Sequence, residues 1–227
     1  MSYRLIRSVV TALAICAAFS ACAPLMFGGV LGGAMVASDR RTTGIQLEDE
    51  TIEHRASSAM SENFGTKEHI SITSYNRQVL ITGEVSNDQV RAQAEALIRK
   101  VQNVQGVVNE LAVGPASSTS DRASDALLVA KVKASMVDTE DVFANVYKVV
   151  GERGTIYLMG RVTQREAQRA TEVVRGVSGV KRVVRVFEYL TEDELRALAP
   201  KRKDETGKQG DAPGAPAANN PVVTPIR

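Results

Sequence analysis

Aromatic residues are scarce in this chain of 227 residues: tryptophan is absent, and Phe, Trp and Tyr together make up 4% of the sequence. Proteins that bind single-stranded nucleic acid usually stack the bases on aromatic side chains, and carbohydrate sites use similar platforms. The composition therefore argues against both ligand classes, and we expect no nucleic-acid partner.

Residues suited to metal or nucleophilic chemistry are also few. The histidines are His54 and His69, and the cysteines are Cys16 and Cys22. Neither histidine has a second His or Cys at the spacing of a metal site, so we expect both to be ordinary surface or boundary residues. The chain has no serine elbow and no glycine-rich nucleotide loop. The sequence predicts a protein that is not an enzyme and holds no cofactor or metal.

The first residues have the pattern of a secretory signal. Arg4 and Arg7 precede an apolar stretch, residues 9–21. This stretch is shorter than the roughly 20 residues of a membrane-spanning helix. We predict that residues 1–21 form a signal peptide that is removed.

Cys22 follows directly, and the small residues before it resemble the lipobox of bacterial lipoproteins. The resemblance implies that Cys22 carries acyl chains such as palmitate and becomes the mature N-terminus. Phe19 stands where the lipobox usually has leucine, and Cys16 follows an isoleucine that is too large for such a site. Ala23, in place of aspartate, favours the outer membrane by resemblance to enterobacterial sorting rules. The alternative is an ordinary cleaved signal with an incidental cysteine.

Two further segments are expected to lie outside the folded domains. Residues 22–45 contain glycine pairs among small and apolar residues, and they predict a flexible tether. Residues 191–227 predict a disordered tail, because the end of the chain is rich in Pro, Ala, Gly and Asn and has no apolar periodicity.

Between these ends one pattern occurs twice. Residues 79–85 and 156–162 are mostly apolar runs that stop at Gly83 and Gly160, add a charged residue and a valine, and lead into a polar helical stretch. A repeat of this length indicates two similar small domains. We place them at residues 46–114 and 121–190, joined by a linker at residues 115–120.

Each domain shows the order helix, strand, strand, helix, strand. The strands are predicted at residues 70–73, 78–85 and 107–113, and again at 143–150, 155–162 and 181–190. Hairpin turns are expected at residues 76–77 and 151–154. This order predicts an α+β fold, in which a three-stranded sheet is covered on one face by two helices.

Three glycines are predicted to be structural. Gly83 and Gly160 lie near strand ends, where glycine usually marks a bulge or a close backbone approach. We expect a bulky side chain at either position to clash with a covering helix. Gly179 lies in the turn before the last strand. Asn103 stands at the matching place in the first domain, and asparagine can take this role because it tolerates a left-handed backbone.

The Gly-x-Val run, the helix after it and the Val-x-Gly-Val turn, taken twice, resemble the BON domain (bacterial OsmY and nodulation). Residues 22–190 resemble outer-membrane lipoproteins with two BON domains, and residues 39–41 and 177–183 are especially similar. The resemblance implies non-enzymatic modules that bind phospholipid or another surface and have a role in envelope integrity.

The charge differs between the two domains. Residues 45–113 contain six Lys and Arg against ten Asp and Glu, and residues 121–190 contain twelve against nine. Each Lys or Arg near an anionic bilayer contributes about 1 kcal/mol of attraction. We therefore expect the second domain to meet anionic headgroups such as phosphatidylglycerol and cardiolipin.

The first helix of the second domain supplies the candidate contact residues. Its core stripe is Leu128, Val132 and Met136, and Leu127 lies about 100° from that stripe, on the face of Lys131. An apolar side chain can insert at an interface while a lysine meets phosphate. The predicted lipid-binding residues are Leu127, Leu128, Lys131 and Lys133. The matching position of Leu127 in the first domain is the polar Thr51.

Two functions are consistent with these features. The first is a lipid-anchored protein on the periplasmic face of the outer membrane, whose second domain binds anionic phospholipid. The rival is an adaptor, in which the same face and Leu127 dock an envelope protein or a second copy. A third alternative is a wider core stripe, in which Leu127 packs against the first domain or another copy and has no role in binding.

Overall fold

The computed structural model describes residues 39–198, which form two α+β domains. The first domain contains two helices, α3 (Thr43–Phe64) and α4 (Asp88–Ile98), and the strands β1 (His69–Tyr75), β2 (Gln78–Val85), β3 (Gly106–Asn109) and β4 (Ala112–Val113). The second contains α5 (Thr119–Val137), the 3-10 turn η2 (Ala144–Val146), α6 (Gln164–Arg175) and the strands β5 (Tyr147–Glu152), β6 (Thr155–Val162) and β7 (Arg182–Tyr189). A short helix, α7 (Glu192–Leu198), follows.

The two sheets have the same topology. In each, the first two strands form an antiparallel hairpin, and the last strand pairs parallel to the central one. In the first domain the last strand is interrupted, and β3 and β4 pair separately with β2. The predicted α+β class and the predicted order of elements are confirmed.

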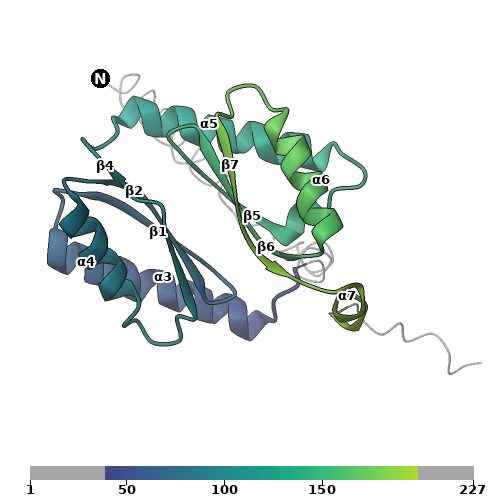
Figure 1. Cartoon of the computed structure of the whole chain (residues 1–227), viewed down its shortest axis with the longest axis horizontal. Coiled ribbons are helices and arrows are strands. Elements are labelled where there is room, and N and C mark those ends of the chain that lie inside the picture. Colours follow the sequence, from purple (N-terminus) through teal and green to yellow (C-terminus); the bar gives the residue numbers. More distant parts are fainter. Residues whose placement is uncertain (1–38, 199–227) are drawn as a thin grey trace, which may run out of the picture.

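The two sheets pack face to face, and the helices cover their outer faces, α3 and α4 on one side and α5 and α6 on the other (Figure 1). Between the sheets lies a third core, formed by Tyr75, Leu80, Tyr157, Met159 and Val186. Each sheet is therefore buried on both faces. This explains why β2 and β6 are apolar almost throughout rather than alternating with polar residues.

Alternation along the central strands separates the three cores. In β2, Val79 and Ile81 pack under the helices of the first domain, while Leu80 between them faces the other sheet. In β6, Leu158 belongs to the helix-side core and Met159 to the core between the sheets. Adjacent residues of a strand point to opposite faces, so one continuous apolar run can supply both layers.

The predicted tether overlaps the folded structure at its end. Helix α3 begins at Thr43, and the Thr42 side chain caps it by accepting a hydrogen bond from the Ile45 amide. Before it, Arg40 binds Glu166 of the second domain at 2.6 Å, and Arg41 binds Asp49 at 2.8 Å. These buried ion pairs fix residues 39–41. The C-terminal segment also differs from the prediction, because residues 192–198 are helical.

Tyr75 adds a polar link between the domains. Its hydroxyl donates to the carbonyl of Val146, 3.2 Å away. Burial raises the pKa of Tyr75 to about 12, so the hydroxyl keeps its proton and remains a donor. Arg41 lies over the same ring, with its guanidinium carbon 4.1 Å from the ring centre.

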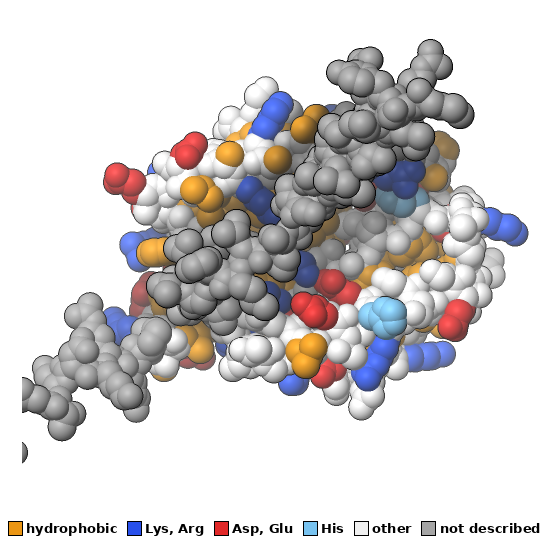
Figure 2. Space-filling model, turned by 180° about the vertical axis from the view of Figure 1, so that it is seen from behind, with side chains coloured by type: hydrophobic (Ala, Val, Ile, Leu, Met, Phe, Trp, Pro, Cys, Tyr) orange, Lys and Arg blue, Asp and Glu red, His pale blue; other side chains and the backbone are white. Residues whose placement is uncertain are grey.

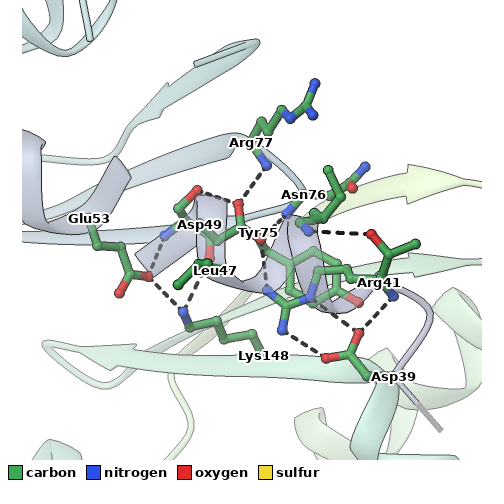
Figure 3. A network of polar contacts seen from close by, with 12 residues as sticks. Asp39, Arg41, Leu47, Asp49, Glu53, Tyr75, Asn76, Arg77 and Lys148 are labelled. Carbon is green, nitrogen blue, oxygen red and sulfur yellow. Dashed lines mark hydrogen bonds and ion pairs between the residues drawn. The ribbon is translucent and has the colours of Figure 1, made fainter. Parts of the chain in front are cut away.

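A buried aspartate on the first helix of each domain holds the hairpin turn of that domain. Asp49 accepts hydrogen bonds from the amides of Asn76 (2.8 Å) and Arg77 (2.7 Å), and Figure 3 shows this network. Asp125 accepts from the amides of Arg153 and Gly154 in the same way. Both turns have positive φ at their two central residues. The first turn lies where it was predicted, and the second is confined to residues 153–154.

At Gly83 and Gly160 the backbone lies close to another segment of the chain, but that segment is not a covering helix. A Cβ on Gly83, where φ is +114°, would lie 2.0 Å from the carbonyl oxygen of His69 on the neighbouring strand. At Gly160 the nearest atom would be the carbonyl oxygen of Val146, at 2.8 Å. The expected clash with a covering helix is thus wrong, because the adjacent β1 or η2 backbone is closer. Gly179 and Asn103 both have positive φ, as expected.

Candidate functional site

Helix α5 is held firmly in place. Ser118 and Asp121 form a capping box at its start, and Asp125 in its second turn binds the β5–β6 hairpin. The helix therefore presents a defined outer face. Figure 1 places this face on the side of the molecule opposite α3 and α4.

Leu128 lies on the inner side of α5. Only 7% of its surface is exposed, and it packs with Val132 and Met136 in the core of the second domain. The prediction that Leu128 contacts lipid is therefore wrong: the core stripe already uses this side chain, and it cannot reach a bilayer with Leu127.

Leu127 points outward, with 66% of its side chain exposed. Val137, ten residues later, is 69% exposed, and Ala130 and Ala134 between them are also exposed. At about 100° per residue, all four lie within a sector of roughly 80°. They form an outer apolar strip on α5, and we use this name for these four residues below.

Lys131 and Lys133 lie on the two borders of the outer apolar strip. Lys131 is about 40° beyond Leu127 around the helix, and Lys133 is about 40° beyond Val137 on the other side. Both side chains are exposed, and among the described residues neither forms an ion pair. The structure thus brings three of the four predicted lipid-binding residues to one face of α5.

The equivalent face of α3 is polar. The residues that match the outer apolar strip 76 positions earlier are Thr51, His54, Ser58 and Ser61. The two helices play the same structural part, because Asp49 and Asp125 occupy matching places and bind matching turns. The difference between their outer faces is therefore not required by the fold.

Phe143 was not among the predicted site residues. It stands between α5 and η2 and is 62% exposed. Val137 and Lys133 of α5 line one hollow together with Ala144, the neighbour of Phe143. Phe143 thus lies close to the C-terminal end of the strip. The sequence did not reveal this exposure, because Phe143 is an apolar residue at the start of a predicted strand. The 3-10 turn at residues 144–146 replaces the start of that strand and leaves Phe143 exposed.

The charges of the molecule are mixed over the surface seen in Figure 2, where Lys and Arg side chains alternate with Asp and Glu. Several arginines of the second domain are also engaged in ion pairs. Arg161 binds Glu188, Arg169 binds Asp141, and Arg182 binds Glu110 of the first domain. The basic excess of the second domain is therefore only partly available to an anionic partner.

A hollow of about 670 Å³ lies between the domains, beside the linker. It is lined by Glu84, residues 113–117, several residues of α5 including Leu128 and Lys131, the turn Arg153–Gly154, and Ser178, Gly179 and Lys181. Lys131 thus contributes both to the border of the outer strip and to this hollow.

His69 belongs to a polar cluster at the edge of this hollow. A ring nitrogen of His69 lies 3.0 Å from Glu84, and the Ser117 amide donates to the same carboxylate oxygen at 3.0 Å. Burial raises the pKa of Glu84, but the hydrogen bonds from Ser117 and His69 outweigh burial and leave it below the ordinary value. His54 is exposed on α3, as expected.

Cys22 and residues 1–21 lie outside the described residues. Within residues 39–198, no helix is both long enough and apolar enough to cross a membrane. The predictions of a signal peptide and of acylation at Cys22 therefore stay predictions.

Comparison with known proteins defines the class. The BON domain family matches residues 48–115 and 124–191, one match for each α+β domain, so the chain belongs to the family of proteins with two BON domains. Over 171 residues it is 39% identical to the outer membrane lipoprotein DolP of Haemophilus influenzae. The aligned segment covers 74% of this chain and 89% of that protein.

Two more distant similarities accompany this one. A 21 kDa hemolysin of Actinobacillus pleuropneumoniae is 29% identical over 154 residues, covering 67% of this chain and 79% of that protein. A solved structure of CdsD, a structural protein of the type III secretion system of Chlamydia trachomatis, is 12% identical and covers 68% of this chain and 98% of that one. Its TM-score of 0.27 is too low to add to the assignment.

Proposed function

We propose that this protein is an outer-membrane lipoprotein that faces the periplasm and binds anionic phospholipid through the outer face of α5. The similarity to an outer membrane lipoprotein with two BON domains supports the location. Cys22 is the proposed anchor, and phosphatidylglycerol and cardiolipin are the proposed lipids. The protein catalyses no reaction in this role, and its binding supports the integrity of the envelope.

The observation that carries the proposal is the outer apolar strip with a lysine on each border. Transferring one large aliphatic side chain from water to an apolar phase contributes about 1.5–3 kcal/mol when burial is complete. Each lysine close to an anionic surface adds about 1 kcal/mol. Leu127, Val137, Lys131 and Lys133 together give weak binding, and an acyl anchor that holds the domain at the bilayer makes weak binding sufficient.

The contacts of residues 39–41, where the chain enters the folded domains, also favour the second domain as the one near the bilayer. Although residues 39–41 precede the first domain, Arg40 binds Glu166 and the carbonyl of Arg161 in the second domain. A chain that comes from an anchor at Cys22 therefore meets the second domain first. With α5 on the lipid, the first domain extends away from the bilayer and its polar α3 face remains free for a protein contact.

Vesicle binding of a Cys22→Ser form, which carries no acyl chains, tests the proposal. We expect more protein to bind phosphatidylglycerol vesicles than neutral phosphatidylcholine vesicles. Leu127→Glu replaces the one leucine of the strip with a negative charge, which the anionic lipid repels, and we expect it to weaken binding about tenfold or more. Thr51→Glu, at the matching position of α3, is the control and is expected to bind as the unchanged protein does. Equal binding to both vesicle types would contradict the proposal.

The adaptor remains the second candidate, because the outer apolar strip would also suit a protein partner. Capture of partners from an envelope extract by the unchanged protein, by Leu127→Glu and by Thr51→Glu separates the two functions. Loss of specific partners in Leu127→Glu, together with unchanged vesicle binding, favours the adaptor. Loss of vesicle binding with partners retained favours the lipid role.

A further inference from the structure

Three residues that the lipid-binding proposal does not use converge at the junction of the domains. His69 begins β1 and Glu84 lies opposite it on β2, while Glu152 ends β5 in the second domain. Their potential ligand atoms, one from each side chain, lie within 4.8 Å of one another. His69 is largely buried, and Glu84 and Glu152 are almost fully buried, with 1% and 7% of their surface exposed.

One of the two carboxylate oxygens of Glu84 has no hydrogen-bond partner among the described residues. One oxygen, Oε2, accepts from the Ser117 amide and contacts the His69 ring. The other oxygen, Oε1, is buried and has no hydrogen-bond partner among the described residues. Its ion pair with the half-exposed Arg153 guanidinium is long, at 3.7 Å, and includes no hydrogen bond. A buried carboxylate oxygen without a partner carries a desolvation cost that a bound cation would remove.

The second buried carboxylate increases this cost. Glu152 is 7% exposed, and its carboxylate lies within 4.8 Å of the ligand atoms of Glu84 and His69. Two carboxylates and one imidazole in a largely buried place are an unfavourable set of neighbours unless a positive charge lies between them.

We propose that His69, Glu84 and Glu152 bind one divalent transition-metal ion, best Zn²⁺, and that this ion links the two domains. Imidazole nitrogen and carboxylate oxygen are common zinc ligands, with bonds of about 2.0–2.2 Å. Ligand atoms within 4.8 Å of one another need only small side-chain rotations to reach such bonds. Mg²⁺ and Ca²⁺ prefer sites made of oxygen alone, so the histidine selects against them.

The surroundings provide a path for the ion. Glu84 and Arg153 line the hollow of about 670 Å³ between the domains, so the site borders a space that an ion can enter. Arg153 is half exposed, so its guanidinium can turn toward solvent when the ion takes its place beside the buried Glu84 carboxylate. Because two ligands come from the first domain and one from the second, the ion stabilises the packed arrangement of the sheets. The inference does not depend on the lipid-binding proposal.

Calorimetric titration of the metal-free, untagged protein with ZnCl₂ tests the site. We expect one Zn²⁺ per chain, and we expect MgCl₂ to give no comparable binding. Glu152→Gln and His69→Gln should each weaken Zn²⁺ binding at least tenfold. The controls are His54→Gln and Glu140→Gln, which change an exposed histidine and an exposed glutamate and should bind as the unchanged protein does.

Thermal unfolding with and without Zn²⁺ gives a second readout. Glu152→Gln keeps the size of the side chain and removes its buried charge, so this variant is expected to fold. Zn²⁺ should raise the melting temperature of the unchanged protein and leave that of Glu152→Gln unaltered. X-ray absorption should find one imidazole among the ligands. Binding of less than one equivalent, or equal binding by Glu152→Gln and the unchanged protein, would overturn the proposal.

Discussion

Arg40 stands before the first domain in the sequence, yet its guanidinium binds the carboxylate of Glu166 in the second domain, with contacts of 2.6 and 2.8 Å. Both side chains are nearly buried, with 10% and 7% of their surface exposed. Arg40 also donates to the carbonyl of Arg161 at 2.7 Å. Glu166 at the same time caps α6 through Thr163. One arginine thus attaches the segment before α3 to the second helix of the distant domain.

We predict that Arg40→Met lowers the free energy of unfolding by about 3 kcal/mol, because it leaves the Glu166 charge buried without its partner. Urea denaturation measures the change. The control is Arg196→Met, since Arg196 and Asp193 form an ion pair with both side chains exposed. Exposed pairs contribute about 0–1 kcal/mol. A loss no larger than that of the control would show that Arg40 contributes little.

The same pair gives a prediction for pH. Burial raises the pKa of Glu166, but Arg40 and Thr163 lower it by more, and the result lies below the ordinary value of 4.5. A carboxyl group whose pKa is lower in the folded state stabilises the fold at pH values above its unfolded pKa. That stability disappears as the pH falls through the folded pKa. The stability difference between the unchanged protein and Arg40→Met should be largest near neutral pH and shrink as the pH becomes acidic, because the buried Glu166 without Arg40 takes up a proton at a higher pH. A difference that stays constant under acidic conditions would contradict this.

Gly83 is the position where a side chain would cost most. We predict that Gly83→Val destabilises the protein by about 3 kcal/mol or more, because φ is +114° there and a Cβ would overlap the His69 carbonyl. This loss corresponds to a fall in melting temperature of roughly 10 °C. Gly114→Val is the control, since a Cβ on Gly114 meets no atom within 4 Å. An unchanged melting temperature in Gly83→Val would contradict the prediction.

Asp125 is predicted to be a stability residue rather than part of a binding site. Asp125→Ala removes the acceptor of the Arg153 and Gly154 amides, and we expect a loss of about 2–3 kcal/mol. Asp125→Asn keeps one oxygen acceptor and should lose less. Asp138→Ala, at an exposed position at the end of the same helix, should be nearly neutral. Chemical denaturation of the three variants checks this order.

The sequence predicted the fold well because the patterns that determine it lie within each domain and occur twice. The apolar runs, the glycines and the turn at residues 76–77 lie within each domain, and the structure confirms the order of elements. Even the pairing of His69 with Glu84 follows from that turn, since the two residues stand equally far from it along the hairpin. The place of Glu152 beside them does not, because it depends on how the two domains pack.

The errors have two different origins. Leu128 was predicted to meet lipid although the helical period already assigned it to the core stripe, and its burial follows that period. Residues 39–41 have a polar, flexible composition, but two arginines there find buried carboxylates in separate domains. Asp49 and Asp125 carry no motif. Their equal spacing in the repeat was the one available signal, and only the hairpin turns explain it.

The core between the sheets leads to a last prediction about cooperativity. Met159 and Tyr157 of β6 pack against Leu80 and Tyr75 of the first domain, so neither sheet can leave the other without exposing apolar surface. We expect the unchanged protein to unfold in one calorimetric transition, with equal calorimetric and van't Hoff enthalpies. Met159→Lys places a charge in this layer and is expected to uncouple the domains, giving two transitions.

Leu158→Ala is the matched control, because Leu158 is the neighbour of Met159 on the same strand but faces the helices of its own domain. It should lower stability by about 2–5 kcal/mol without uncoupling the sheets. Two transitions in the unchanged protein would contradict the prediction. A single transition in Met159→Lys would show that the polar contacts, such as that of Arg40 with Glu166, suffice to couple the domains.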